Sequence, residues 1–159
     1  MTLRLGFIGT GFARRVQLPG LRHVPGVAAT AVASGRRANA DAVAREFSIA
    51  NVFDDGEALA RSGDVDAVVI SSTPDSHARF AIAAITAGKH VLCEKPMAVS
   101  AAEAQTMVAA AAQHPKQVAW LDHELRYEPN RRKARDLIRA GTIGAVRHIE
   151  LSLDRKSVV

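Results

Sequence analysis

The sequence has few aromatic residues. Phenylalanine, tyrosine and tryptophan make up 4% of the 159 residues, whereas hydrophobic residues make up 48% and charged residues 23%. The last two fractions are ordinary for a globular protein, and a chain of this length buries one sizeable core. Because alanine is abundant, we expect helices that pack closely on a sheet rather than a β-sandwich.

Cysteine and long hydrophobic runs are also scarce. The single cysteine, Cys93, excludes an internal disulfide framework and fits a reducing compartment. It lies in the apolar run 91–93, which favours a small buried side chain over a reactive thiol. No apolar stretch approaches the roughly 20 residues that cross a bilayer, and Gly6 begins a glycine-rich segment where a secretory signal would need apolar residues. We therefore expect a cytoplasmic protein with no membrane segment.

The net charge of +5 is the one compositional feature that points to an acidic partner. Arginines are dispersed along the chain except at residues 131–135, and no aromatic residues alternate with them there. A basic run without aromatics favours a solvated helix face over a nucleic-acid site. We expect no nucleic-acid partner and no metal site.

Short apolar runs alternate with helical patterns along the first 122 residues. The runs indicate buried strands at residues 3–8, 27–33, 51–53, 66–71, 90–93 and 118–121. Because these runs are almost continuously apolar and helices separate them, they predict a parallel sheet covered on both faces. Right-handed crossovers then leave one α/β architecture, the doubly wound or Rossmann sheet. Trp120, in the last run, is expected in the core.

Capping residues mark the predicted helix ends. A helix after Gly11 is expected to break near Pro19, and another is predicted over residues 39–47. The side chains predicted to cap further helices are Asp55, Asp75, Ser100 and Asn130, and the glycines predicted to follow helix ends are Gly88 and Gly141. Glu103, three residues after Ser100, completes a capping-box pattern.

The pattern changes after residue 122. We assign residues 1–122 to the Rossmann domain and residues 123–159 to a linker and the start of an incomplete α+β domain. Residues 145–153 alternate between polar and apolar side chains, which predicts the first strand of a different sheet. The chain ends before that sheet is complete.

A glycine-rich turn follows the first strand. It contains Gly9, Thr10, Gly11 and Phe12. Backbone N–H groups and a helix N-terminus at such a turn suit a pyrophosphate. The usual third small residue is missing because position 14 is arginine, and Ala13 is expected to take its packing role. The motif alone also fits a plain tight turn, but its place at the start of an alternating series favours a dinucleotide site.

The end of the second strand bears on cofactor choice. Sites that select NAD usually place an acidic residue here for the ribose hydroxyls, whereas this sequence has Ser34, Arg36 and Arg37. A hydroxyl and two guanidinium groups attract a 2′-phosphate. The residues favour NADP, with NAD as the alternative, and they also fit a polar loop that opens a helix.

Two further segments carry a family resemblance. Ser72, Thr73, Pro74 and His77 follow the fourth strand, and residues 88–98 read Gly-Lys-His-Val-Leu-Cys-Glu-Lys-Pro-Met-Ala. The combination resembles the Gfo/Idh/MocA family of oxidoreductases, whose hallmark is the Glu-Lys-Pro triplet. The resemblance runs from about residue 3 to residue 151, and the sequence departs from the family at Arg14, Gln17 and Asp75.

The resemblance implies an oxidoreductase that transfers a hydride between a nicotinamide cofactor and a sugar or polyol. It implies that Lys95 is catalytic and also contacts the cofactor, that Glu94 lies near the nicotinamide ribose, and that the Lys95-Pro96 bond is a candidate cis peptide. Ser72, Thr73 and Pro74 are expected to line the cofactor cleft. His77 is assigned to the cofactor site through a hydrogen-bonding role at a helix N-terminus. Arg126, like His123, is expected either to line the cleft or to join the domains.

Members of this family carry a second domain that supplies the substrate pocket, an acid–base histidine and much of the oligomer interface. The resemblance therefore implies a truncated substrate domain here and a homo-oligomer for the complete protein. A second possibility remains open, in which the chain is a non-catalytic nucleotide-binding module or an inactive fragment.

Overall fold

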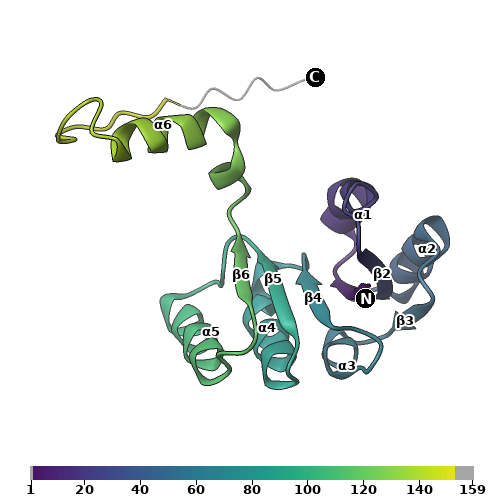
Figure 1. The fold of residues 1–159 in the computed structure, drawn as a ribbon. Coiled ribbons are helices and arrows are strands. Elements are labelled where there is room, and N and C mark those ends of the chain that lie inside the picture. Colours follow the sequence, from purple (N-terminus) through teal and green to yellow (C-terminus); the bar gives the residue numbers. More distant parts are fainter. Residues whose placement is uncertain (1, 153–159) are drawn as a thin grey trace. The chain divides into compact units, whose positions relative to one another are not determined.

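The structure is a computed structural model that describes residues 2–152. Contacts divide the chain into two units, 1–122 and 123–159 (Figure 1). The strands are β1 (Leu3–Ile8), β2 (Val27–Ala33), β3 (Asn51–Phe53), β4 (Ala67–Ile70), β5 (His90–Glu94) and β6 (Ala119–Asp122). The first unit also contains η1 (Ala13–Gln17), α1 (Leu18–Leu21), α2 (Arg37–Phe47), α3 (Gly56–Arg61), η2 (Pro74–Ser76), α4 (His77–Thr86) and α5 (Ala101–Gln113). The second unit contains η3 (Glu124–Tyr127) and α6 (Pro129–Arg139).

The six strands form one parallel sheet in the order β3-β2-β1-β4-β5-β6. This order confirms the predicted doubly wound fold. The strand order reverses between β1 and β4, so their connections leave the sheet in opposite directions. Doubly wound sheets bind ligands at the carboxyl ends of the two strands on either side of such a reversal.

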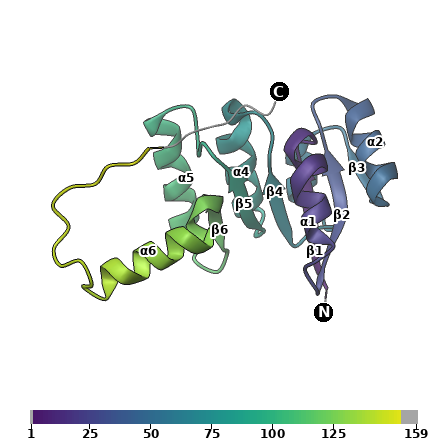
Figure 2. The ribbon, with the colours of Figure 1, turned by 90° about the horizontal axis from the view of Figure 1, so that it is seen from above.

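Helices cover the two faces of the sheet unequally. One core layer joins the sheet to α3, α4 and α5, and the other joins it to α1 and α2. Figures 1 and 2 show α4 and α5 beside β4–β6, and α1 and α2 beside β1–β3. Within the first unit, no helix covers β6 on the α1 side of the sheet. Trp120 lies on that edge strand and is 48% exposed, so the prediction that it packs in the core is wrong.

Most predicted helix ends are confirmed. The Asp55 carboxylate accepts a hydrogen bond from the Ala58 N–H at 3.2 Å, and the Ser100 hydroxyl accepts one from the Glu103 N–H at 3.2 Å. Gly88 and Gly141 follow helix ends with positive φ, a conformation that glycine adopts without a Cβ clash.

Two predicted caps are wrong. Asp75 lies inside the 3₁₀ turn η2, and α4 begins only at His77 without a side-chain cap. At α6 the cap is Glu128, whose carboxylate accepts from the N–H groups of Asn130 and Arg131, so Asn130 is already inside the helix. Proline occupies the first position of the turn η2 and of α6, so each of these elements starts before the residue predicted to cap it.

Two other predictions concern the first helix and residues 145–153. The first helix, predicted to break near Pro19 and Gly20, changes from the π-helical turn η1 to α1 at Leu18 and ends at Leu21. Residues 145–152 form no strand, and residue 153, the last of the predicted strand, lies outside the described residues. An isolated extended segment has no neighbouring strand to complete its backbone hydrogen bonds, so its alternating pattern alone does not make a sheet.

Candidate functional site

The glycine turn brings β1 close to β4. Gly9 has a φ of +98°, and a Cβ there would lie 2.5 Å from backbone atoms of Ser71 and Ser72. At Gly11 a Cβ would meet no atom within 4 Å, so the space in front of this residue is open. Ala13 is fully buried, as the packing role assigned to it requires. The turn is thus closed on the sheet side and open on the other, which fits the approach of a phosphate to backbone N–H groups.

The end of β2 places a hydroxyl beside this turn. The hydroxyls of Ser34 and Thr10 are 3.4 Å apart, and the Arg36 N–H donates to the Ser34 hydroxyl at 3.4 Å. The exposed Arg36 guanidinium makes no hydrogen bond or ion pair with any residue from 2 to 152. A hollow between the turn and α2, lined in part by Gly11 and Arg14, extends this surface.

Arg37, by contrast, already has two acidic partners. Its guanidinium donates to Asp54 at 2.7 Å and to Asp41 at 2.8 Å, and these bonds raise the pKa of Arg37. Sequence reasoning missed both carboxylates. Asp41 lies four residues after Arg37 on α2, whereas Asp54 is seventeen residues away and reaches Arg37 only through the pairing of β2 with β3. Of the two arginines, Arg36 is therefore the one whose charge is available to a ligand.

The Glu-Lys-Pro segment lies at the carboxyl end of β5. Glu94 is 9% exposed, the next residue, Lys95, is exposed, and the Lys95-Pro96 peptide is cis as predicted. Gln17 Nε2 donates to Glu94 Oε1 at 3.0 Å, while Gln17 Oε1 is buried with no hydrogen-bond donor among the described residues. Burial, and then the neighbouring Asp122 carboxylate, raise the pKa of Glu94. Neither Gln17 nor Asp122 was among the predicted site residues.

His77 connects two loops of this edge. Its ring is 1% exposed, with Nδ1 2.8 Å from the Pro96 carbonyl and Nε2 3.1 Å from the Ser72 carbonyl. The ring therefore lies behind the loop after β4 and the loop after β5. His77 can therefore affect ligand binding only by positioning these two loops.

The remaining predicted residues fall into two groups. Ser72, Thr73 and Pro74 form the loop between β4 and α4, and the Ser76 hydroxyl fixes it by donating to the Thr73 carbonyl at 2.7 Å. Arg126 belongs to the second unit, where it borders a basic hollow with three arginines of α6. Its assignment to the cofactor site stays a prediction.

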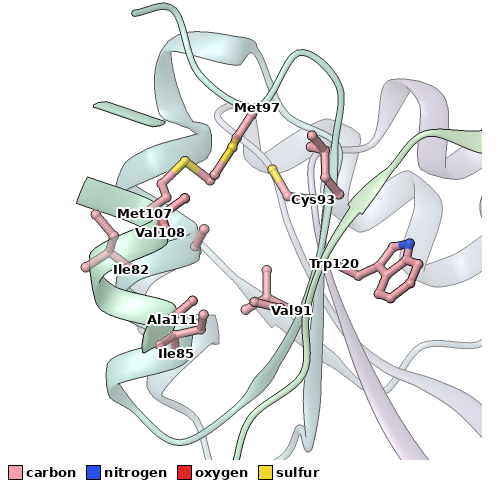
Figure 3. Close-up of a pocket in the computed structure, with 12 residues that line it drawn as sticks. Ile82, Ile85, Val91, Cys93, Met97, Met107, Val108, Ala111 and Trp120 are labelled. Carbon is pink, nitrogen blue, oxygen red and sulfur yellow. The ribbon is translucent and has the colours of Figure 1, made fainter. Parts of the chain in front are cut away.

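An apolar cavity of about 180 Å³ lies elsewhere, between α4, α5, β5 and β6 (Figure 3). The Cys93 sulfur faces the side where Met97 and Met107 lie, and the Trp120 indole points away from that side. Cys93 is buried as predicted, and burial and then Glu94 raise the pKa of its thiol to about 12. No charged side chain lines the cavity, so it offers nothing to a phosphate.

Within residues 2–152, no three histidine, cysteine, aspartate or glutamate side chains gather as metal ligands. Across the same part of the chain, no helix is long and apolar enough to cross a membrane.

A dinucleotide fits the features of the carboxyl edge described above. These features are the glycine turn, the open space at Gly11 and the buried acceptor of Gln17.

Known proteins are similar to this chain in sequence and fold. Inositol 2-dehydrogenase from Serratia proteamaculans is 37% identical over 146 residues, which are 91% of this chain and 43% of that protein. The structure of scyllo-inositol dehydrogenase from Lactobacillus casei with bound NAD(H) and scyllo-inositol has a TM-score of 0.85 at 27% identity, with 91% of this chain and 43% of that chain covered. A 3-ketoreductase from Actinomadura kijaniata, solved with NADP and TDP-benzene, has a TM-score of 0.80 at 31% identity over 92% of this chain and 46% of that one.

The chain thus spans less than half the length of these relatives. The model of an oxidoreductase family with an NAD-binding Rossmann fold, Gfo/Idh/MocA, matches residues 3–122, the whole sheet from β1 to β6. The resemblance seen in the Glu-Lys-Pro segment and the observed fold agree with this match, and the chain belongs to the Gfo/Idh/MocA oxidoreductase family.

Proposed function

We propose that this chain is the cofactor-binding part of an NADP(H)-dependent oxidoreductase that acts on a hydroxyl-bearing carbon of a polyol or sugar. The observation that carries the proposal is the position of Lys95. It follows the buried Glu94 at the carboxyl edge of the sheet, the same edge that holds the open glycine turn. A protein that only bound a nucleotide would have no need of a lysine at this place.

The first three strands provide the adenosine half of the site. Backbone N–H groups of Gly9, Thr10, Gly11 and Phe12 bind the pyrophosphate. Ser34 and Arg36 bind a 2′-phosphate, with Arg37 adding less because Asp41 and Asp54 already neutralise it. Solved relatives hold either NAD(H) or NADP, so similarity to them does not fix the cofactor. In this proposal the residues at the end of β2 decide the preference. The lack of an acidic side chain at 34–37 favours NADP.

The last three strands provide the reacting half. The bound nicotinamide supplies the hydride chemistry. Ser72, Thr73 and Pro74 line the cleft, and Glu94 faces the ribose. The Lys95 ammonium binds the substrate oxygen, stabilises the negative charge that develops on it, and exchanges a proton with it.

A second function is favoured by the length of the chain. These 159 residues correspond to 43% of the length of the inositol 2-dehydrogenase that they resemble. We therefore propose that these 159 residues bind the cofactor without turning over polyols. The complete enzyme is a cytoplasmic homo-oligomer in this proposal, and a free thiol fits that compartment.

Fluorescence titration and turnover assays test both statements. The purified chain should bind NADPH, should bind NADH more weakly, and should not reduce the oxidised cofactor in the presence of inositols or sugars. No binding of either cofactor would refute the proposed function. Measurable turnover would refute the second statement and leave the first intact.

A further inference from the structure

Two carboxyl groups meet at the carboxyl edge of the sheet. Glu94 ends β5, Asp122 ends β6, and the two residues are register partners across these strands. As register partners on neighbouring parallel strands, they point their side chains to the same face of the sheet. An ionised carboxylate only accepts hydrogen bonds, so two neighbouring carboxyl groups can hydrogen bond to each other only when one of them holds a proton. The geometry therefore favours a pair that shares one proton.

The surroundings of the pair favour this state. Glu94 is almost wholly buried, and the Gln17 amide that donates to its Oε1 carries no charge. Burial and the Asp122 carboxylate both raise the pKa of Glu94, while the backbone N–H and the charge of Lys95 act in the opposite direction. The adjacent Cys93 thiol is neutral, since its own pKa is raised to about 12. Two charged carboxylates side by side would repel each other, which favours a proton on one of them.

The pair stands in the half of the sheet that takes the nicotinamide. In a doubly wound sheet the two halves bind the two mononucleotides of a dinucleotide, and β4–β6 also carry the Glu-Lys-Pro segment. The nicotinamide ring bears a positive charge when oxidised and none when reduced. A positive charge brought near a partly buried carboxyl pair stabilises its ionised form.

We propose that the Glu94–Asp122 pair holds one proton before the cofactor binds and releases it to solvent when the oxidised cofactor binds, whereas binding of the reduced cofactor leaves it in place. One O–H bond breaks, the proton passes to water, and no electrons move. The inference rests on the proposed function, since it requires a nicotinamide in this cleft. It makes pH a control over which redox form of the cofactor the protein prefers.

The test is the pH dependence of two dissociation constants measured on the whole chain. NADP⁺ and NADPH are titrated by calorimetry at several pH values, and their ratio is followed because the 2′-phosphate titrates in both and cancels. If NADP⁺ binding releases one proton, the affinity for NADP⁺ relative to NADPH should rise about tenfold for each unit of increasing pH. This dependence holds over the pH range in which the free pair keeps its proton and the pair in the NADP⁺ complex has lost it. Glu94→Gln and Asp122→Asn should each flatten this dependence. Asp64→Asn, at the opposite edge of the sheet, should keep it.

Infrared spectroscopy follows the same proton directly. The free protein should show the carbonyl stretch of a protonated carboxyl group, absent in Glu94→Gln and in Asp122→Asn, and NADP⁺ but not NADPH should abolish it. A ratio that does not change with pH in the wild type, or a carboxyl band that NADP⁺ leaves intact, would overturn this inference alone. Failure of both cofactors to bind would overturn the proposed function, and this inference with it.

Discussion

Replacing Arg36 by alanine should narrow the preference for NADPH over NADH. A hydrogen bond to a charged group contributes about 1.5–3 kcal/mol. Arg36 is exposed, so we expect the lower end of this range, which corresponds to about a tenfold loss of NADPH affinity. NADH affinity should stay within about twofold, because NADH has no 2′-phosphate for this side chain to meet. Titration of cofactor fluorescence measures both constants.

Arg37 offers a matched comparison. Its removal leaves the Asp41 and Asp54 carboxylates without their partner, and they should then repel the 2′-phosphate. Arg37→Ala should therefore weaken NADPH binding through the uncovered acids, and adding Asp54→Asn should restore part of it. If Arg36→Ala left the ratio of NADPH to NADH affinity unchanged, the assignment of the 2′-phosphate site would be refuted.

Three other perturbations probe the site, the core and the acid stability. In a complete version of the protein, Lys95→Met should lower turnover by about 10²–10⁴-fold with little change in NADPH affinity, and arginine should not replace lysine. Turnover within a few-fold of wild type would remove Lys95 from the mechanism. Gly56→Ala would place a Cβ 2.7 Å from the Phe80 ring, and thermal unfolding should show a loss of about 1–3 kcal/mol; an unchanged melting temperature would contradict this packing. Hydrogen bonds from Arg4 lower the pKa of Asp66 from 3.8 to about 2. The stability that this pair adds is present above pH 3.8 and is lost as the pH falls toward 2. Asp66→Asn should therefore reduce the loss of stability between pH 3.8 and 2, as measured by acid unfolding followed by circular dichroism. An unaltered unfolding curve would count against the bond.

The sequence alone was sufficient to predict those strands and helix ends whose local pattern agrees with the fold. The six strands follow from near-continuous apolar runs, and Gly88 ends α4 through a local conformation that needs no tertiary contact. Trp120 was misplaced because the alternation of strands and helices does not say which face each helix covers. On an edge strand with helices on one side only, half of the side chains stay exposed.

The site was predictable only in part. Glycine turns and the Glu-Lys-Pro triplet are contiguous in sequence, so they could be recognised directly. The contacts of Gln17 with Glu94, of Arg37 with Asp54 and of His77 with Pro96 join residues that the chain separates and the sheet brings together. One signal was available, since Asp122 directly follows a predicted strand and must share the carboxyl edge with Glu94.

The buried ring of His77 has a mechanical consequence. Because the ring is packed between the Ser72 and Pro96 carbonyls, with one nitrogen close to each, it links the loop after β4 to the segment bearing Lys95. His77 is also the first residue of α4, so the lysine takes its alignment from the seating of that helix on the sheet. In a complete enzyme that uses Lys95, loosening α4 would misalign the lysine well before the domain unfolds, and the temperature at which activity declines would then lie below the melting temperature.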